Sequence, residues 1–189
     1  MGIVMVNAAV SLDGFIAGPN DEMDWVFDRA LLPDEPLAVI DDVIANTGAI
    51  LSGRGSFDVG EAMAREETSE AFGGRWSGPE FVLTHRPPPE PPRHDVAFLS
   101  VDVIDAVATA RDAAGGKNLL VLGANVVQQC LEADLVDEVL LVVLPIVLGD
   151  GVRLFGRGSY RERLFETVRA EQVGQAAVLH FRRLTQSPR

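Results

Sequence analysis

The chain has 189 residues, of which 47% are hydrophobic and 23% charged, a composition typical of one globular domain and not of a disordered chain. Its 28 acidic residues outnumber 16 Lys and Arg, and the net charge of −12 argues against broad binding to nucleic acid or to an anionic membrane. One cysteine and three histidines exclude an internal disulfide framework and the common zinc-binding spacings, so we expect no metal site. The start lacks a signal-peptide pattern and the apolar run at 139–148 is too short to span a bilayer, so we expect a soluble cytoplasmic protein.

Strands and helices are predicted to alternate through the first part of the chain. The valine-rich run at 3–10 predicts a buried strand, and a long loop follows it to about residue 36. Charge and glycine at 60–80 predict a mobile loop. A stiff, proline-rich surface connection is predicted at 85–94. The further strands are predicted at 49–52, 81–84 and 97–100, and helices at 39–44, after Gly53, and after a cap at Ser100 or Asp102.

The second part of the chain changes character after residue 139. A strand at 118–122 leads into a helix that begins at Gly123, and 139–147 predicts a long strand buried on both faces. Two strands at 164–173 and 175–184 then follow without helices, which predicts a terminal antiparallel hairpin. The sequence therefore predicts a single α/β domain over 1–189, with a mostly parallel mixed sheet and helices on both faces.

Two predicted strand-to-helix junctions begin with glycine, in the segments LSGRGS and VLGAN. The free N–H groups at a helix start favour anions, and glycine lets a ligand approach the backbone closely. Neither segment matches the GxGxxG or the P-loop pattern, so each is also consistent with a simple tight turn. Because ligands of open α/β sheets bind at the carboxyl ends of the strands, these two junctions and the THR segment after a third strand predict a dinucleotide site.

The chain resembles the dihydrofolate-reductase-like family, and most closely the C-terminal reductase domain of bifunctional riboflavin-biosynthesis deaminase/reductases and its stand-alone relatives. The resemblance rests on the segments NAAVSLDGFIAG, MDW, AILSGRGSFDVG, FVLTHRPP and NLLVLGANVVQQCLEADLVDEVLLVVLPIVLGDGVRLF. It implies a three-layer αβα fold and NADPH-dependent transfer of hydride to a small heterocyclic or ribosylamino-pyrimidine-like substrate. It also implies a homodimer formed through the late strands.

The resemblance further implies which positions bind NADPH. The GR junction would hold phosphate, the THR segment would flank the 2′-phosphate, the VLGAN junction would cradle the pyrophosphate, and the first strand and its loop would line the nicotinamide. The implied cofactor-binding residues are Ala9, Ile16, Gly18, Gly53, Arg54, Ser56, Thr84, His85, Arg86, Gly123, Ala124, Asn125 and Val126.

Three further residues are candidates for the reaction itself. Asp13 is a candidate catalytic residue, which would orient a ribose hydroxyl or relay a proton, and its alternative is an aspartate that closes an Asx turn before Gly14. Trp25 would stack on a planar substrate or belong to the core, and Asp150 would bind substrate or shape a turn. Arg29, Arg65 and Arg153 are candidates for a substrate phosphate.

The chain also departs from related families. Folate reductases carry a carboxylate on the helix before the GR strand, a slot that falls near Leu37, and the nearest acids Asp34, Glu35 and Asp41 are offset. The zinc motifs of the deaminase half do not occur. True dihydrofolate reductase and a non-catalytic nucleotide-binding oligomer remain the alternatives.

Overall fold

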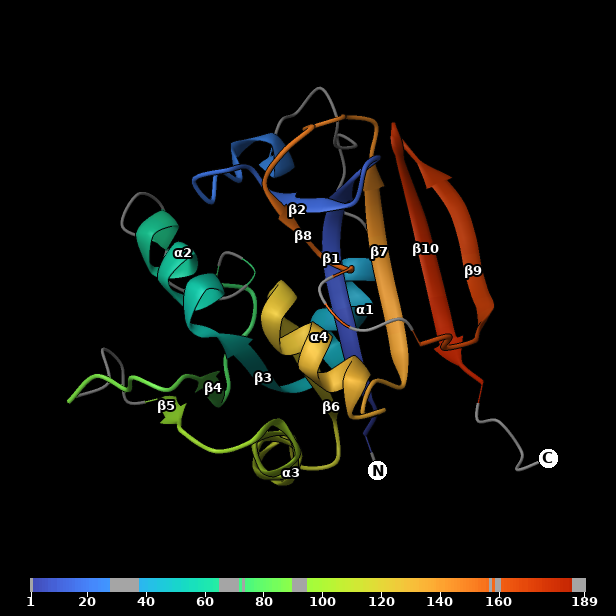
Figure 1. Cartoon of the computed structure of the whole chain (residues 1–189). Coiled ribbons are helices and arrows are strands. Elements are labelled where there is room, and N and C mark those ends of the chain that lie inside the picture. The colour runs from blue at the N-terminus through green and yellow to red at the C-terminus, as the bar shows by residue number, and fades with distance from the viewer. Residues whose placement is uncertain are drawn as a thin grey trace.

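A mixed sheet runs through the centre of the molecule (Figure 1), and the computed structural model describes residues 2–27, 38–64, 72, 74–89, 95–156, 158 and 161–184. The strand order is β5-β4-β3-β6-β1-β7-β10-β9, with neighbours from β5 to β7 parallel and β10 antiparallel to both β7 and β9. The strands are β1 (Val4–Ser11), β3 (Thr47–Gly53), β4 (Glu80–Leu83), β5 (Val96–Leu99), β6 (Asn118–Leu122), β7 (Glu138–Leu144), β9 (Phe165–Val173) and β10 (Ala176–Arg183).

Helices cover both faces of this sheet. On one face, which we name the α1 face, Val39 and Val43 of α1 (Ala38–Asn46) pack in a buried cluster with Ile50 and Leu120 of the sheet. Phe57 of α2 (Arg54–Ala64) packs on Val82 of β4. The opposite face, the α4 face, is covered by α3 (Val103–Ala113) and α4 (Ala124–Glu132). The predicted α/β class with a mostly parallel sheet is confirmed.

Local sequence signals explain most of the element boundaries. Asp102 caps α3, as predicted, because its carboxylate accepts the backbone N–H of Asp105 at 2.9 Å. After α3 the backbone takes positive φ at Gly115 (61°) and Gly116 (88°), which glycine adopts without strain. β7 ends at Leu144 and not at 147, because Pro145 has no N–H to donate to a neighbouring strand.

Two predicted loop regions contain regular or buried structure in their described parts, and residues 28–37, 65–71 and 73 lie outside these parts. The loop predicted at 60–80 begins with the last turn of α2, and Trp76 lies in the core at 9% exposure. The indole Nε1 of Trp76 donates to the carbonyl of Thr47 at 3.0 Å, which holds the segment against β3. The long loop after β1 contains a short strand, β2 (Phe15–Ala17), which pairs with β8 (Val152–Arg153), and a 3-10 turn, η1 (Asp24–Phe27). Strands of two or three residues carry no detectable alternation.

Within the described residues, no helix combines the length and the apolar character that crossing a membrane requires.

Candidate functional site

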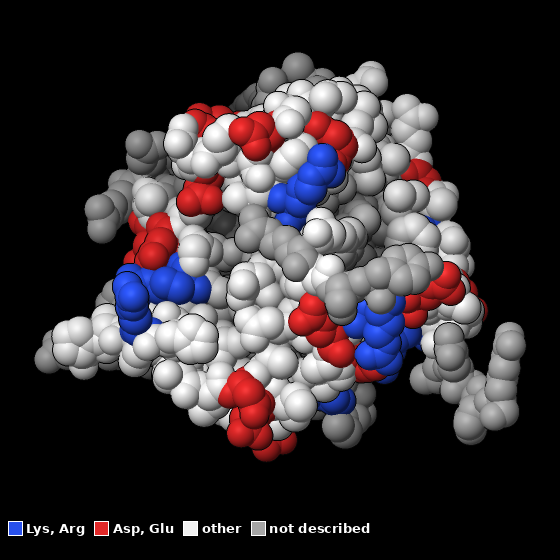
Figure 2. Space-filling view, viewed as in Figure 1, with Lys and Arg blue, Asp and Glu red and all other residues white. Residues whose placement is uncertain are grey.

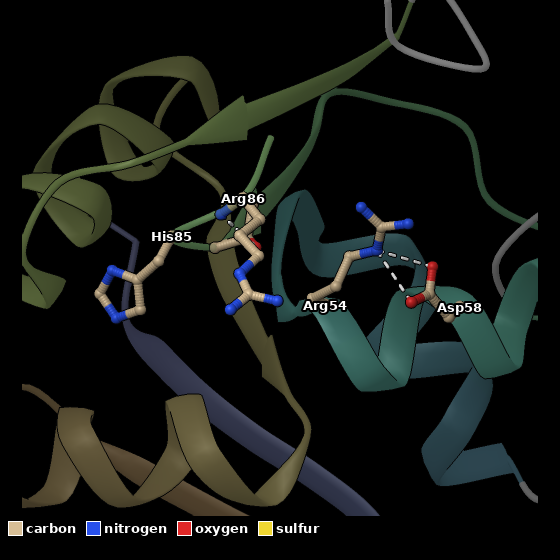
Figure 3. A pocket seen from close by; sticks show the side chains of 5 residues that line it. Arg54, Asp58, His85 and Arg86 are labelled. Atoms are coloured by element: carbon tan, nitrogen blue, oxygen red, sulfur yellow. Dashed lines mark hydrogen bonds and ion pairs between the residues drawn. The ribbon is translucent and has the colours of Figure 1, made fainter. Parts of the chain in front are cut away.

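The carboxyl ends of β3 and β4 meet at a cavity of about 380 Å³ (Figure 3). Arg54 is the first residue of α2, directly after β3, and Thr84, His85 and Arg86 directly follow β4. These strands are parallel neighbours, so their carboxyl ends present side chains to the same space. In Figure 3 the Arg86 guanidinium lies between His85 and Arg54, and both guanidinium groups are exposed to the cavity. Figure 2 shows basic side chains in a few separate groups on this face, among acidic ones.

The two arginines differ in the interactions that their side chains make with the rest of the protein. Arg54 Nε contacts both carboxylate oxygens of Asp58, at 2.7 and 2.8 Å, and its guanidinium carbon lies 5.7 Å from the centre of the Phe98 ring. Arg86 donates its backbone N–H to Thr84 Oγ1 at 3.2 Å, and its side chain forms no ion pair with any described residue. Asp58 lies one turn after Arg54, so the i,i+4 spacing is a signal for this pair that the sequence-based predictions did not use.

The two glycine junctions touch each other. A Cβ added at Gly123, where φ is 85°, would lie 2.1 Å from Ser56 Oγ, and one added at Gly53 would lie 3.2 Å from a methyl of Val126. Glycine is therefore required at Gly123 by backbone conformation and by close approach together. The structure thus brings together the residues that the resemblance assigned to two phosphate-binding segments.

The start of α4 has the features of an anion site. No side chain caps the helix at Gly123, so the N–H groups of its first turn remain for another partner. Ala124 and Val126 are buried, whereas Asn125 is exposed and its Oδ1 accepts Gln129 Nε2 at 2.7 Å. The amide oxygen of Asn125 is therefore engaged within its own helix, and the junction also offers its backbone N–H groups.

The end of β1 leads into the predicted nicotinamide region. Ala9 and Ile16 are half-buried, and Gly18 is buried. A Cβ on Gly151, where φ is 132°, would lie 2.1 Å from the carbonyl oxygen of Ala17, so the loop before β8 presses on the end of β2. Ala9, Ile16 and Gly18 belong to the carboxyl-end region but do not line the cavity at Arg54 and Arg86.

Asp13 is held by the loop that follows β7. Its Oδ1 accepts the Ser11 hydroxyl at 2.7 Å and the Leu148 N–H at 3.2 Å, and its Oδ2 accepts the Gly149 N–H at 2.8 Å. The Ser11 hydroxyl bond, with help from these N–H groups, lowers the pKa of Asp13 from 3.8 to about 2. The Asx turn is not formed, since Phe15 N–H donates to Ser11 Oγ at 2.9 Å. Asp13 therefore joins two loops as a carboxylate.

The remaining candidates lie apart from the arginine cavity. Trp25 is half-buried against the cluster that contains Val142 of β7 and Ile40 of α1, and its Nε1 donates to the Glu22 carbonyl at 3.3 Å. Asp150 lines a second cavity of about 310 Å³ with Arg153 and Phe155. There Arg153 stacks 4.4 Å above the Phe15 ring and donates to the Asp13 carbonyl at 2.7 Å.

Some sequence candidates fall outside the described residues, namely Arg29, Asp34, Glu35, Leu37 and Arg65. Asp41, the third offset acid, lies on α1 and is ion-paired with Arg75. Among the described residues no three His, Cys, Asp or Glu side chains are grouped closely enough to hold a metal ion.

An open, mostly parallel sheet with glycine junctions and arginines at its carboxyl ends is the arrangement of nucleotide-binding α/β domains. The chain belongs to the RibD C-terminal domain family, whose model matches residues 3–179. It is 29% identical over 157 residues to the uncharacterized protein YyaP of Bacillus subtilis (strain 168), covering 80% of this chain and 79% of that protein.

Solved structures agree with this assignment. A putative riboflavin biosynthesis protein from Shewanella sp. PV-4 superposes with a TM-score of 0.80 at 25% identity, over 96% of this chain and 99% of that one. A diaminohydroxyphosphoribosylaminopyrimidine deaminase/5-amino-6-(5-phosphoribosylamino)uracil reductase from Thermotoga maritima gives a TM-score of 0.66 at 17% identity, over 97% of this chain and 57% of that one. The chain therefore has a reductase-domain fold.

Proposed function

We propose that this protein is an NADPH-dependent reductase that transfers hydride to a small heterocyclic substrate of the ribosylamino-pyrimidine type. The observation that carries the proposal is the pair of guanidinium groups, from Arg54 and Arg86, at one cavity beside two glycine junctions. Arg86 makes no ion pair within the described part of the chain, and arginine is the natural bidentate partner of a phosphate. Membership of the RibD C-terminal domain family supports the same class of chemistry.

The residues present fit this cofactor. Arg54, His85 and Arg86 would hold the 2′-phosphate, and the backbone at Gly123 and the first turn of α4 would hold the pyrophosphate. Ala9 and Ile16, from β1 and β2, would flank the nicotinamide. The cofactor supplies the hydride when bound, and the chain supplies orientation and a pocket that limits water.

The expectation about folate rests on the sequence, which has no carboxylate at the slot near Leu37. The carboxylate that folate reductases use falls near Leu37, which lies outside the described residues, and Asp41 is engaged by Arg75. We therefore expect slow or absent turnover of dihydrofolate. Consumption of NADPH with any substrate separates this enzyme from a nucleotide-binding protein without catalysis.

The test of the cofactor site is a comparison of NADPH and NADH binding. We expect the unmodified protein to bind NADPH much more tightly, because NADH lacks the 2′-phosphate. Since charge-assisted hydrogen bonds contribute about 1.5–3 kcal/mol, Arg86→Ala should narrow the difference by roughly tenfold or more. Arg169→Ala, which removes a surface arginine paired with Glu171 on β9, is the control and should change neither affinity. Equal affinity of the unmodified protein for both cofactors would refute the assignment.

We also propose that the protein forms a homodimer through the late strands. On the α4 face, the packed helices lie over β3, β4 and β6, and Figure 1 shows no helix in front of β10 and β9. Leu141, Leu179 and Phe181 share this face by their register and stay half-buried. An apolar sheet face of this kind is usually covered by a partner, and two-fold pairing is the commonest solution.

Light scattering at micromolar concentration tests the dimer. A mass near twice 20.3 kDa supports it, and a mass near 20.3 kDa rejects it. Leu179→Lys should convert the dimer to a monomer, because it introduces an unpaired charge into the apolar surface. Val147→Lys, at an exposed position beyond β7, is the matched control. A Leu179→Lys protein that remained dimeric would reject this interface while retaining the dimer.

A further inference from the structure

Each residue of the turn between β1 and β2 (residues 12–14) is hydrogen-bonded to the chain that runs from β7 through β8. Strands β1 and β7 are parallel neighbours and end opposite each other, so their two connections leave the sheet side by side (Figure 1). The Leu12 N–H donates to the Ile146 carbonyl at 2.8 Å, and the Leu154 N–H donates to the Gly14 carbonyl at 3.0 Å. The first and last residues of the turn are thus fixed by backbone hydrogen bonds.

Asp13, the middle residue of the turn, contributes to this contact with both its side chain and its backbone. Its carboxylate accepts the N–H groups of Leu148 and Gly149, at 3.2 and 2.8 Å. Its backbone carbonyl accepts Arg153 Nη1 at 2.7 Å. Hydrogen bonds in which one partner is ionised are roughly twice as strong as neutral ones. The strongest bonds of the contact are therefore those at the centre of the turn, and Arg153 makes one of them.

Arg153 also contacts strand β2 directly. It is the cross-strand partner of Phe15, and its guanidinium carbon lies 4.4 Å from the centre of the Phe15 ring. Phe15 is only 4% exposed, although β2 belongs to a ribbon of two short strands outside the main sheet. A planar guanidinium that stacks on a ring and donates to a carbonyl at the same time has one orientation that satisfies both contacts. Arg153 therefore fixes the turn and β2 relative to each other.

Neighbouring residues of β2 contact different parts of the molecule. Phe15 and Arg153 line the second cavity, of about 310 Å³. Ile16 packs instead against the buried cluster on the α4 face, and it is one of the two residues that flank the nicotinamide in the proposed function. Arg153 therefore holds a strand that carries a cofactor-flanking residue, while its own side chain lines a different cavity from that of Arg54 and Arg86.

We propose that Arg153 is a positioning residue, which acts through the Asp13 carbonyl and the Phe15 ring to fix the turn and the strand beside the nicotinamide. With these contacts intact, the nicotinamide end of the site is formed before the cofactor arrives, so binding does not have to order it. Without them, part of the binding free energy is spent on ordering the turn, and the affinity falls. This inference rests on the proposed reductase function, because it concerns the nicotinamide half of the same cofactor site.

The experiment compares two ligands by calorimetry: NADPH, and adenosine 2′,5′-bisphosphate, which keeps the 2′-phosphate and lacks the nicotinamide. Arg153→Leu removes the guanidinium and keeps an apolar side chain over Phe15. We expect it to weaken NADPH binding by roughly tenfold, the size of one hydrogen bond to a charged group, and to leave adenosine 2′,5′-bisphosphate binding unchanged. Arg86→Ala should weaken both ligands, because both carry the 2′-phosphate. Arg169→Leu, in the surface pair on β9, is the matched control and should change neither affinity.

A second variant separates orientation from charge. Arg153→Lys keeps the positive charge but has no planar group to stack on Phe15 while it donates to the Asp13 carbonyl. We expect Arg153→Lys to recover little of the NADPH affinity that Arg153→Leu loses. The two ligands also separate positioning from a loss of folded protein, since a partly unfolded sample binds both of them less. Thermal melting of each variant shows the temperature at which the binding data come from folded protein.

The outcomes separate this inference from the proposed function. If Arg153→Leu weakens both ligands equally, or weakens neither, the positioning role is overturned and the cofactor site remains intact. Full recovery of NADPH affinity by Arg153→Lys also overturns it, since a nearby positive charge would then be sufficient. Failure of the unmodified protein to bind either ligand overturns the proposed function itself.

Discussion

Some polar groups at the carboxyl ends of the parallel strands lack partners within the described residues, whereas those at the amino end of β7 are paired. At the carboxyl ends, Arg86 has no ion pair within the described residues, and Asn7 and Ser52 have unpartnered oxygens. At the amino end of β7, Glu138 is 7% exposed and bonds both His180 Nε2 at 2.7 Å and Arg182 Nε at 2.8 Å. Charged groups that complete their bonds within the fold stabilise it, whereas incomplete groups mark where a ligand would complete them.

The paired corner extends beyond Glu138. Asp137 Oδ2 accepts the Val4 N–H at 2.8 Å, which ties the start of β7 to the start of β1. Glu138, by its hydrogen bond and its charge, raises the pKa of Arg182 above its usual value. Next to it, Asp134 lies near the guanidinium groups of Arg161, Arg163 and Arg183. This corner has the features of a structural clamp between the parallel and antiparallel parts of the sheet.

The largest effect is expected from breaking that clamp. Glu138→Gln removes the buried charge and weakens the hydrogen bonds that His180 and Arg182 make to it. Because Arg182 is 55% exposed and remains hydrated, no buried charge is left unpaired, and we expect a loss of about 1–2 kcal/mol in the free energy of unfolding by urea. Glu171→Gln, in the exposed pair with Arg169, should change stability by less than about 1 kcal/mol. Similar values for the two variants would show that Glu138 is not a clamp.

The sequence predicted the parallel part well because its signals are local. Asp102 and Gly123 directly precede the first residues of α3 and α4, and runs of Val and Leu indicate the buried strands. The arginine cavity was also foreseeable, because residues that follow neighbouring parallel strands must meet. The neighbourhood of β3 and β4 itself came only from the family resemblance and the structure.

What the sequence did not predict depends on contacts between distant segments. Trp76 is buried by packing in the cluster on the α1 face and bonds Thr47, 29 positions earlier, and no periodicity surrounds the indole. Besides the nearby Ser11, the partners of Asp13 lie 135 and 136 positions away along the chain, so a turn-forming aspartate and a loop-joining one look alike in sequence. Whether the buried hydroxyl of Ser52 finds a hydrogen-bond partner likewise depends on its neighbours in space, which the sequence of the strand does not show.

An intermediate effect is expected at Asp13, which belongs to the carboxyl ends but is fully bonded. Its pKa is lowered to about 2 from 3.8, so the carboxylate stabilises the fold above pH 3.8 and that contribution is lost as the pH falls toward 2. Asp13→Asn should therefore be less stable than the unmodified protein at neutral pH, and the difference should shrink between pH 4 and pH 2.

Urea unfolding at a series of pH values measures this difference. Asp24→Asn, which replaces an exposed aspartate on η1, is the control substitution. A difference between Asp13→Asn and the unmodified protein that stayed constant over the whole range would contradict the loop-joining role and leave the expectation of a catalytic Asp13 in place.

The smallest effect is expected at Asp58, which lines the arginine cavity and already pairs with Arg54. Its carboxylate holds Arg54 at 2.7 Å, on a surface where the two side chains are 52% and 43% exposed. Exposed pairs at i,i+4 contribute about 0.3–0.5 kcal/mol, so Asp58→Asn should hardly change the free energy of unfolding.

A bound phosphate has to share Arg54 with this carboxylate. Removing the competing charge should therefore tighten NADPH binding by roughly twofold, the factor that corresponds to such a pair. NADH, which has no 2′-phosphate, should bind as before, and it serves as the matched control ligand. Weaker NADPH binding by Asp58→Asn would instead mean that Asp58 positions Arg54 for the phosphate.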